Sequence, residues 1–293
     1  MLESSISRAP VHFVHAADGT RLAYRERGEG PAVVLANGLS TSEFFWRLLV
    51  PRWAREHRVI TWDYKGHGRS EPARSDAGCT IPAVLDDMCR VMDAARVEQA
   101  VLVGFSMGCQ VVTEAWRRIP QRVVGLAYLL GPAGRIFDTA LQPLVGPALR
   151  QLLRMPGPWL PPVFGAVHRL AGLPGSMHMG RWLRLYGRAP NADLQRYLDH
   201  FGQLDPYTLA RLALAAGEHD AREVLPTITV PTVVVAGDRD VFAPSQRVGV
   251  PMHAAIPGAR LLRIDDGTHL GIVEHHEPIG RAVDELLGDA WGR

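Results

Sequence analysis

The chain has 293 residues, of which 47% are hydrophobic and 21% charged, and 32 Lys and Arg against 30 Asp and Glu leave a formal net charge of +2. This composition fits a globular protein with one large core and room for a small inserted subdomain, and it excludes a disordered or collagen-like chain. The net charge is too small for the basic field that binds a phosphate backbone, so no nucleic-acid partner is expected.

The first predicted elements form a hairpin, because residues 11–15 and 21–25 flank Asp18-Gly19, a pair that supplies the positive φ angles of a tight turn. Short apolar runs without polar alternation follow, and such runs are typical of strands buried on both faces: 31–36, 58–63, 100–105, 124–130, 232–236 and 260–264. Helical spacing predicts helices over 43–54, 81–95, 107–119 and 278–287. The alternation predicts an α/β fold, a mostly parallel sheet with helices on both faces and ligand sites outside the carboxyl ends of the strands.

The alternation stops between Gly134 and Gly217, where the chain is rich in Pro, Gly, Met, Trp and Leu. This segment is too long for a plain connection between a strand and a helix. We therefore predict a cap, or lid, over residues 134–216 and an α/β core formed by residues 1–133 and 217–293. The apolar side chains of the cap should be buried in a small core of its own or face a cleft below it: Trp159, Leu160, Phe164, Met177, Met179, Trp182 and Leu185.

Residues 101–109 run from an apolar strand through Gly-x-Ser-x-Gly into a helix. Such an abrupt reversal strains the backbone of the corner residue, and Gly104 and Gly108 remove the side chains that would clash. Ser106 is therefore the candidate nucleophile. The Met107 amide lies in the first turn of the helix, where unpaired N–H groups favour an oxyanion. The alternative interpretation is a glycine-rich turn with an idle serine.

A serine hydroxyl near neutral pH needs a base, and histidine is the expected one. Of the 12 histidines, His269 is favoured because it follows the run 260–264 and a turn, which places it on a loop at the carboxyl edge of the sheet. His67 lies on another loop of the same edge and is the second candidate. His275 and His276, just before the last helix, are expected at the surface or in a helix cap.

The base needs an orienting carboxylate, and Asp238 and Asp240 both follow the run 232–236 at the correct edge. Asp240 is favoured because it lies deeper in the loop, before a stiff apolar stretch that could hold a buried carboxylate. Asp238 is interpreted as a turn residue whose side chain caps nearby amides. A second oxyanion donor is expected from the loop after 31–36, which offers the Leu39 amide.

Residues 1–10 lack an apolar run behind a positive start, and no stretch is long enough to span a membrane, so we expect a cytoplasmic protein. Cys79, Cys89 and Cys109 are an odd number without metal-ligand spacing, which favours buried or idle thiols over a disulfide framework. Cys109 lies close to the elbow and is interpreted as a small core residue.

With these segments the chain resembles the α/β-hydrolase family over nearly its whole length outside the cap. The resemblance rests on 37–38, 63–70, 104–108, 237–240 and 267–269. It implies the order Ser, Asp, His in a catalytic triad of Ser106, Asp240 and His269, with the amides of Leu39 and Met107 as oxyanion hole. No phosphate loop, metal cluster or dinucleotide motif is present in the sequence, so no cofactor and no metal are expected. The chain departs from many relatives at two positions, with Asn37 for His and Lys65 for Arg.

A serine at the elbow argues against dehalogenases and epoxide hydrolases of this family, which carry an aspartate there. The first hypothesis is a carboxylic-ester hydrolase that acts on small to medium, mainly apolar esters through an acyl-enzyme. A C–C bond hydrolase or a thioesterase with the same triad is the nearest alternative. A noncatalytic small-molecule binding protein on this fold is the alternative from a different functional class.

Overall fold

An eight-stranded sheet forms the centre of the computed structural model, which describes residues 9–140, 145–154, 162, 166, 169–170, 173, 176–182 and 185–292. The strand order is β1-β2-β4-β3-β5-β6-β7-β8. The strands are β1 (His12–His15), β2 (Arg21–Arg27), β3 (Ala32–Ala36), β4 (Arg58–Trp62), β5 (Ala100–Phe105), β6 (Val123–Leu129), β7 (Thr232–Gly237) and β8 (Arg260–Ile264).

The sheet is mostly parallel, as the sequence predicts. Strand β2 pairs antiparallel with β1 and with β4, and every other neighbouring pair is parallel. The hairpin contains the expected positive φ at Gly19, 80°. Its loop is longer than a two-residue turn, because it spans residues 16–20 and is closed by a hydrogen bond from the Ala16 N–H to the Thr20 carbonyl, 2.8 Å.

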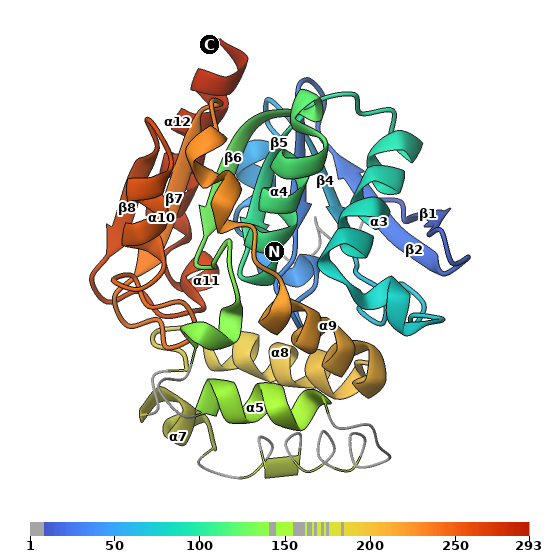
Figure 1. Cartoon of the computed structure of the whole chain (residues 1–293), viewed down its shortest axis with the longest axis vertical. Helices are drawn as coiled ribbons and strands as arrows, with labels where there is room; N and C mark the ends of the chain where they lie inside the picture. Colours follow the sequence, from blue (N-terminus) through green and yellow to red (C-terminus); the bar gives the residue numbers. More distant parts are fainter. Residues whose placement is uncertain are drawn as a thin grey trace.

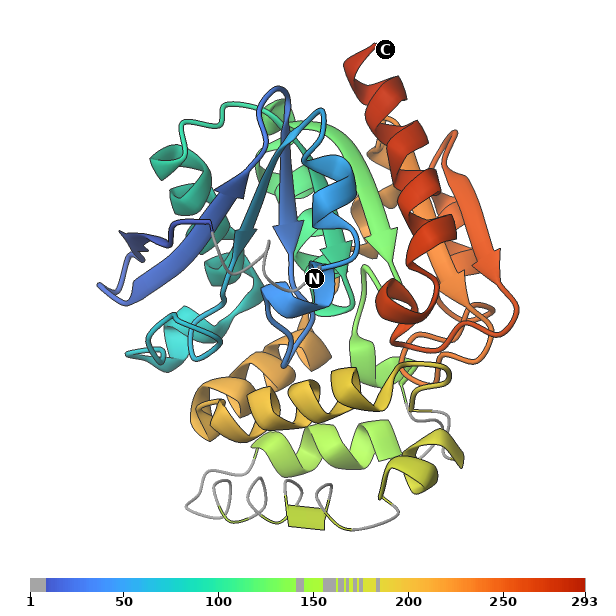
Figure 2. The same cartoon turned by 180° about the vertical axis from the view of Figure 1, so that it is seen from behind.

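Helices cover both faces of the sheet (Figures 1 and 2). Both faces need cover because successive side chains along a strand point to opposite faces and are apolar on each. Val34 and Ile60 belong to one apolar cluster, and Val33 and Val59 belong to the other. The first cluster lies under α3 (Ile81–Ala94), α4 (Met107–Arg118) and α10 (Gly249–Ala255). The second lies under η1 (Glu43–Trp46), α2 (Val50–Trp53), α11 (Gly271–Glu274) and α12 (His276–Trp291).

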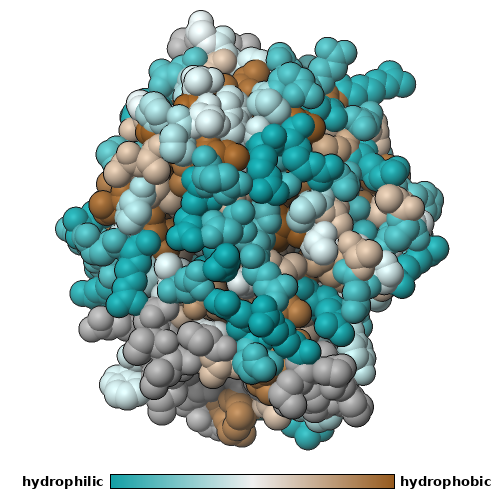
Figure 3. All heavy atoms as spheres, in the orientation of Figure 1, coloured by the Kyte–Doolittle hydropathy of each residue, from teal (hydrophilic) through white to brown (hydrophobic). Residues whose placement is uncertain are grey.

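The outer side of α3 and α4 is largely polar. In the space-filling view, hydrophilic residues cover most of the face that carries these two helices, with apolar atoms in scattered spots (Figure 3). The buried residues of α3 recur at helical spacing, among them Val84, Leu85, Met88 and Val91. Each helix therefore contributes one apolar stripe to the core.

Two expectations about local structure are wrong. The helix expected over 43–54 is broken into η1 and α2, because Pro51 stands in the first turn of α2, where a missing N–H is tolerated, and could not continue a preceding helix. Strand β8 is not buried on both faces. Only Ile264 of its residues is fully buried, since β8 pairs with β7 alone and forms the edge of the sheet.

The helices of segment 134–216 gather at the carboxyl end of the parallel strands (Figure 2). Those that the structure describes are α5 (Val145–Arg154), α7 (Ser176–Trp182), α8 (Asn191–Gln203) and α9 (Pro206–Glu218, which ends just past the segment), preceded by η4 (Ile136–Asp138). The short elements η2 (Asp76–Cys79), η3 (Pro120–Arg122) and η5 (Arg222–Thr227) connect parts of the core. None of the helices in the described part of the chain combines the length and apolar character needed to cross a membrane.

The apolar residues expected to be buried in this segment differ in their exposure, and some lie outside the described residues. Trp182 is 77% exposed, so that expectation is wrong there; the residue ends the short helix α7, and no described side chain covers its ring. Leu185 is half-buried. Met177 and Met179 belong to α7, and Trp159, Leu160 and Phe164 lie outside the described residues.

Candidate active site

Ser106 occupies a strained corner between β5 and α4, with φ 52° and ψ −117°. The neighbouring glycines make this corner possible through close backbone contacts. A Cβ on Gly104 would stand 2.5 Å from the Gly108 carbonyl oxygen, and one on Gly108 would stand 2.1 Å from that of Ala36. Side chains cannot replace either glycine without moving the backbone.

The sequence interpretation missed a third glycine at this corner. A Cβ on Gly131 would stand 2.2 Å from the carbonyl oxygen of Ser106. Gly131 closely follows β6, the strand that pairs with β5, and the preceding Leu130 also has a positive φ, 53°. A glycine just after the strand beside the elbow is the signal that could have identified it.

Ser106, His269 and Asp240 form an unbroken line of hydrogen-bonding side chains. Ser106 Oγ lies 2.9 Å from His269 Nε2, and His269 Nδ1 lies 2.8 Å from Asp240 Oδ2. The other Asp240 oxygen accepts the backbone N–H groups of Phe242 (2.8 Å) and Ala243 (2.9 Å). Because a carboxylate oxygen accepts, Nδ1 carries the imidazole proton and Nε2 presents a lone pair to the serine hydroxyl.

Aromatic rings and backbone bonds fix the imidazole of His269. The ring centroids of Phe105 and Phe242 lie 5.4 Å and 4.9 Å from its own. The loops that carry Asp240 and His269 are joined, because the Arg239 N–H donates to the Gly267 carbonyl, 2.9 Å. Asp240 and His269 therefore hold a defined relative position although they lie on loops that follow different strands.

Asp238 does not cap nearby amides, and that expectation is wrong. Its oxygens accept from the Arg263 guanidinium at 2.7 and 2.8 Å and from the Ser245 hydroxyl. The Arg263 side chain, which bonds to Asp238, holds the pKa of this carboxyl below its usual value. The reason lies in the sheet register, since β7 and β8 are paired and Arg263 on β8 reaches the end of β7. The amides of this loop are capped by Asp240 instead.

The structure does not join His67 to Ser106 by a hydrogen bond. His67 is buried, its Nδ1 lies 2.9 Å from the Lys65 carbonyl oxygen, and its Nε2 accepts the Ser40 N–H at 3.2 Å. Both ring nitrogens are thus occupied within the described structure. His275 Nε2 lies 3.5 Å from Asp266 Oδ1, and His276 Nδ1 lies 3.2 Å from the Val273 carbonyl oxygen.

The loop after β3 rests against the serine. A Cβ on Gly38 would stand 3.1 Å from Ser106 Cβ, so the peptide that leads into Leu39 borders the nucleophile. Met107 is the first residue of α4, where a backbone N–H has no acceptor within the helix. The two amides expected as oxyanion donors therefore belong to the two segments that flank Ser106.

The two departures from the family pattern are accommodated by specific partners. Asn37 Nδ2 donates to the Trp62 carbonyl (2.6 Å), and Asn37 Oδ1 accepts from the Trp46 indole (2.7 Å). Lys65 is buried and pairs with Asp18 at 3.3 Å and Asp87 at 3.2 Å. Burial raises the pKa of Asp87 to about 6, against the opposing effect of the Lys65 charge.

The three cysteines are free thiols, and Cys79 and Cys109 are buried. Cys109 Sγ lies 3.3 Å from the Gly104 carbonyl oxygen and belongs to the apolar cluster under α4. Burial raises its pKa well above the usual value. The interpretation of Cys109 as a core residue is confirmed.

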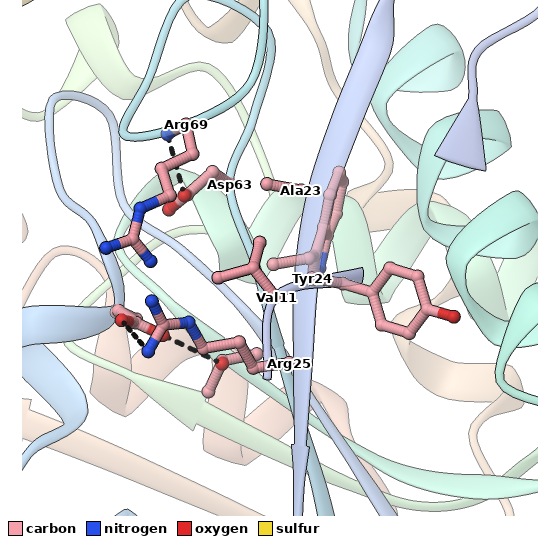
Figure 4. Close-up of a pocket in the computed structure, with 9 residues that line it drawn as sticks. Val11, Ala23, Tyr24, Arg25, Asp63 and Arg69 are labelled. Carbon is pink, nitrogen blue, oxygen red and sulfur yellow. Dashed lines mark hydrogen bonds and ion pairs between the residues drawn. The ribbon is translucent and has the colours of Figure 1, made fainter. Parts of the chain in front are cut away.

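A small pocket on the β2–β4 side of the sheet is lined by neither Ser106, Asp240 nor His269 (Figure 4). Arg25 pairs with Glu43 across it at 3.3 Å, and Asp63 Oδ2 accepts the Arg69 N–H at 3.0 Å. Burial, followed by the Glu43 charge, raises the pKa of Asp63 to about 7. Its lining contains Val11, Ala23, Tyr24, Arg25, Glu43, Thr61, Trp62, Asp63 and Arg69. We therefore place the candidate active site elsewhere, at Ser106.

Residues 31–276 match the family model of the alpha/beta hydrolase fold. The chain belongs to the α/β-hydrolase family. It is 29% identical, over 88% of its length and 91% of the relative, to a protein of Azorhizobium caulinodans named as a carbamate hydrolase, RutD.

Two solved structures of this family share the whole architecture. The enol-lactonase from Burkholderia xenovorans LB400 superimposes with a TM-score of 0.75 and 26% identity, covering 94% of this chain and 99% of its own. The thermophilic esterase from Thermogutta terrifontis superimposes with a TM-score of 0.77 and 25% identity, covering 96% of this chain and 99% of its own. These relatives support hydrolase activity for the chain.

Proposed function

We propose that this chain is a serine hydrolase that cleaves carboxylic esters of small to medium, mainly apolar substrates through an acyl-enzyme. One observation carries the proposal, the line of hydrogen bonds from Ser106 Oγ through His269 to Asp240, with heavy-atom distances of 2.9 and 2.8 Å. An esterase and an enol-lactonase among the structural neighbours favour acyl transfer to water from an oxygen ester.

In the first step, Ser106 Oγ attacks the ester carbonyl carbon while its proton passes to His269 Nε2. The Asp240 carboxylate stabilises the imidazolium that forms, and its own orientation is set by the amides of Phe242 and Ala243. The tetrahedral intermediate collapses when the bond to the leaving alcohol breaks and His269 returns the proton to that oxygen.

In the second step, water attacks the acyl-enzyme while His269 takes its proton, and the Ser106–acyl bond then breaks as His269 returns that proton to Ser106 Oγ and the acid is released. The negative oxygen of both intermediates would be bound by the amides of Leu39 and Met107. Such donors lower the barrier by about 3 to 4 kcal/mol each in hydrolases. The first N–H groups of α4 add the positive end of the helix dipole at the same place.

We propose that residues 134–216 form a cap over this site and that residues 1–133 and 217–293 form the core. The two ends of the segment meet at one side chain of α4. Gln110 Nε2 donates to the carbonyls of Gly134 (2.9 Å) and Ala216 (2.8 Å). The Ala221 N–H donates to the carbonyl of Ala133, the residue just before the segment, at 3.1 Å.

The preference for apolar substrates is supported by aromatic side chains around the triad. Phe105 and Phe242 contact the His269 ring, and Phe45 stacks on Phe105 with ring centroids 6.4 Å apart. Tyr197 from α8 meets Phe45 edge to face at 5.5 Å. An acyl or alkyl group that reaches Ser106 would pass these rings, which favours apolar groups.

Ser106→Ala tests the proposal with a chromogenic short-chain ester. We expect kcat/KM to fall by at least about a thousandfold, because the covalent step is lost. A variant that keeps more than a tenth of the wild-type kcat/KM would exclude Ser106 as the nucleophile. Ser75→Ala is the matched control, since Ser75 lies at the start of η2, away from the triad.

A fluorophosphonate separates catalysis from simple binding. The wild-type chain should gain the mass of one phosphonyl group on Ser106, and Ser106→Ala should gain none. Absence of an adduct on the wild-type chain would favour a noncatalytic binding protein. A panel of an ester, an acyl thioester and a vinylogous diketone, compared by kcat/KM, tests the choice of an oxygen ester over a thioester or a C–C bond.

A further inference from the structure

Residues 38–41 form a tight turn directly after β3, and this turn contains the Leu39 amide. The Thr41 N–H donates to the Gly38 carbonyl at 3.3 Å, and Thr41 Oγ1 donates to the same oxygen at 2.9 Å. Ser40, the third residue of the turn, has a φ of 61°. A positive φ at this position is typical of a type II turn, whose central peptide is turned over relative to type I, and a non-glycine residue adopts it at a cost. Contacts from outside the turn must therefore favour this conformation.

His67 supplies the first of these contacts. The N–H of the central peptide, that of Ser40, donates to His67 Nε2 at 3.2 Å. Nδ1 of the same ring lies 2.9 Å from the Lys65 carbonyl oxygen, which can only accept, so Nδ1 carries the proton and Nε2 is an acceptor. Burial lowers the pKa of His67 to about 4, which keeps the ring neutral. A neutral ring in this tautomer selects the peptide orientation found in the turn.

The segment that carries His67 is itself held firmly. Lys65 lies two residues before it and is buried between Asp18 and Asp87 at 3.3 and 3.2 Å. The His67 side chain is buried between the rings of Tyr64 and His200, whose centroids lie 6.0 and 6.3 Å from its own. The acceptor offered to Ser40 therefore has a fixed position.

Tyr197 of α8 supplies the second contact. Its hydroxyl lies 2.9 Å from Ser40 Oγ, and its ring packs edge to face on Phe45. Helix α8 thus reaches the same residue of the turn that His67 binds. Ser40 is held by a backbone bond to the core and by a side-chain bond to α8.

We propose that His67 is a positioning residue for the oxyanion hole, which holds the peptide of Ser40, and through it the Leu39 amide, in the orientation that Ser106 chemistry requires. This inference rests on the proposed function. His67 acts through the turn and touches neither the nucleophile nor the substrate carbonyl. Its loss should weaken stabilisation of the transition state and leave substrate binding nearly intact.

Two uncharged substitutions test the two hydrogen bonds of the His67 imidazole separately. The side-chain oxygen of His67→Gln reaches the position of Nε2 and can accept from Ser40. The amide of His67→Asn lies near Nδ1 and can serve only the Lys65 carbonyl. We expect His67→Asn to lower kcat about tenfold to a hundredfold with KM within about twofold, and His67→Gln to remain within about threefold of wild type.

His253→Asn is the matched control, because His253 lies in α10, which packs on β7 and β8, and neither strand neighbours β3 and the turn that follows it. Its kcat should stay within about twofold of wild type. Melting temperatures of all variants show whether activity merely follows stability. In the wild-type chain, 15N NMR should report a protonated Nδ1 and an unprotonated Nε2 at His67 near neutral pH.

Several results would overturn the inference: wild-type kcat in His67→Asn, equal losses in the Asn and Gln variants that follow their melting temperatures, or an Nε2-protonated His67. Each of them leaves Ser106 labelling by fluorophosphonate intact in the wild-type chain, and with it the proposed function. An unlabelled wild-type chain would instead overturn the proposed function and this inference together.

Discussion

Strand β5 and helix α8 face each other across the candidate active site, and they are held in place by different means. All six residues of β5 are buried, and backbone bonds join it to β3 and β6. In α8 only Leu194 is fully buried, and polar side chains tie the helix to the core, Asp193 to Arg47 and Tyr197 to Ser40. The position of Ser106 is thus fixed by close backbone contacts, and that of α8 by side-chain contacts that can be exchanged.

The largest effect should come from Asp240→Asn, which leaves the backbone fit intact and breaks only the triad. The amides of Phe242 and Ala243 require an acceptor and will hold the Asn oxygen. The Asn NH₂ then faces His269 Nδ1 and forces the proton onto Nε2, the wrong tautomer. We expect kcat to fall by about 10⁴-fold with little change in melting temperature.

Asp238→Asn is the matched control for that prediction. It removes the ion pair with Arg263 at the edge of the sheet and should leave kcat unchanged. The role given to Asp240 would be wrong if both variants lost activity to a similar extent.

Gly108→Ala tests the backbone fit itself. The added Cβ would stand 2.1 Å from the Ala36 carbonyl oxygen, so β3 and α4 must separate. We expect a loss of about 3 kcal/mol or more in the free energy of unfolding, measured by urea denaturation. Gly258→Asn is the control, because that position has a φ of 69° and nothing within 4 Å of a Cβ. A Gly108→Ala protein as stable as the wild type would contradict the conclusion that close backbone contacts fix the position of Ser106.

Gln110→Leu tests the connection between the two regions. It removes the bonds from α4 to the Gly134 and Ala216 carbonyls and leaves buried acceptors unpaired. We expect about 1 to 3 kcal/mol of destabilisation and faster hydrogen exchange around both carbonyls. Gln99→Leu loses an equivalent bond at the surface, to the Gln121 carbonyl, and should cost less than 1 kcal/mol. Equal effects would show that Gln110 does not join the cap to the core.

The last comparison concerns proton binding at α8. Burial lowers the pKa of His200 from 6.5 to about 4. As the pH falls from 6.5 towards 4, the unfolded chain binds a proton that the folded chain refuses, so stability falls. His67 adds a loss of the same sign. Asp63, with its pKa raised to about 7, acts in the opposite direction, because its contribution is lost as the pH rises.

We therefore expect His200→Leu to lose less stability than the wild type between pH 6.5 and pH 4, seen as a smaller fall in melting temperature. The difference in unfolding free energy should be at most about 1.4 kcal/mol per pH unit. His178→Leu, at an exposed position, is the control. An unchanged slope in His200→Leu would show that this side chain takes up its proton equally in the folded and unfolded states.

The parts of this molecule that sequence predicts well are those in which one local pattern decides the structure. The run 100–105 became β5 with the predicted bounds, since six apolar residues before a glycine-flanked serine allow few alternatives. The incomplete burial of β8 and the break in segment 43–54 depend on sheet order and on one proline, respectively. Local periodicity reports neither.

The same distinction holds around the candidate site. Ser106, Asp240 and His269 were singled out because each ends or follows a strand at one sheet edge. His67 lies at the same edge and Gly131 follows a strand there, but that placement does not predict their roles, because these depend on contacts with Ser106 and Ser40, which lie in turns after other strands. The helices of segment 134–216 follow no strand pattern, and their contacts with the rest of the molecule are set by tertiary packing alone.

The Gln110 amide has a practical consequence for protein engineering. Both ends of segment 134–216 converge on one side chain of the helix that follows the nucleophile. A foreign helical segment whose first and last residues keep those two carbonyls in place could be transplanted there as a module. Chimeras built at these junctions would exchange segment 134–216 while preserving Ser106, Asp240 and His269.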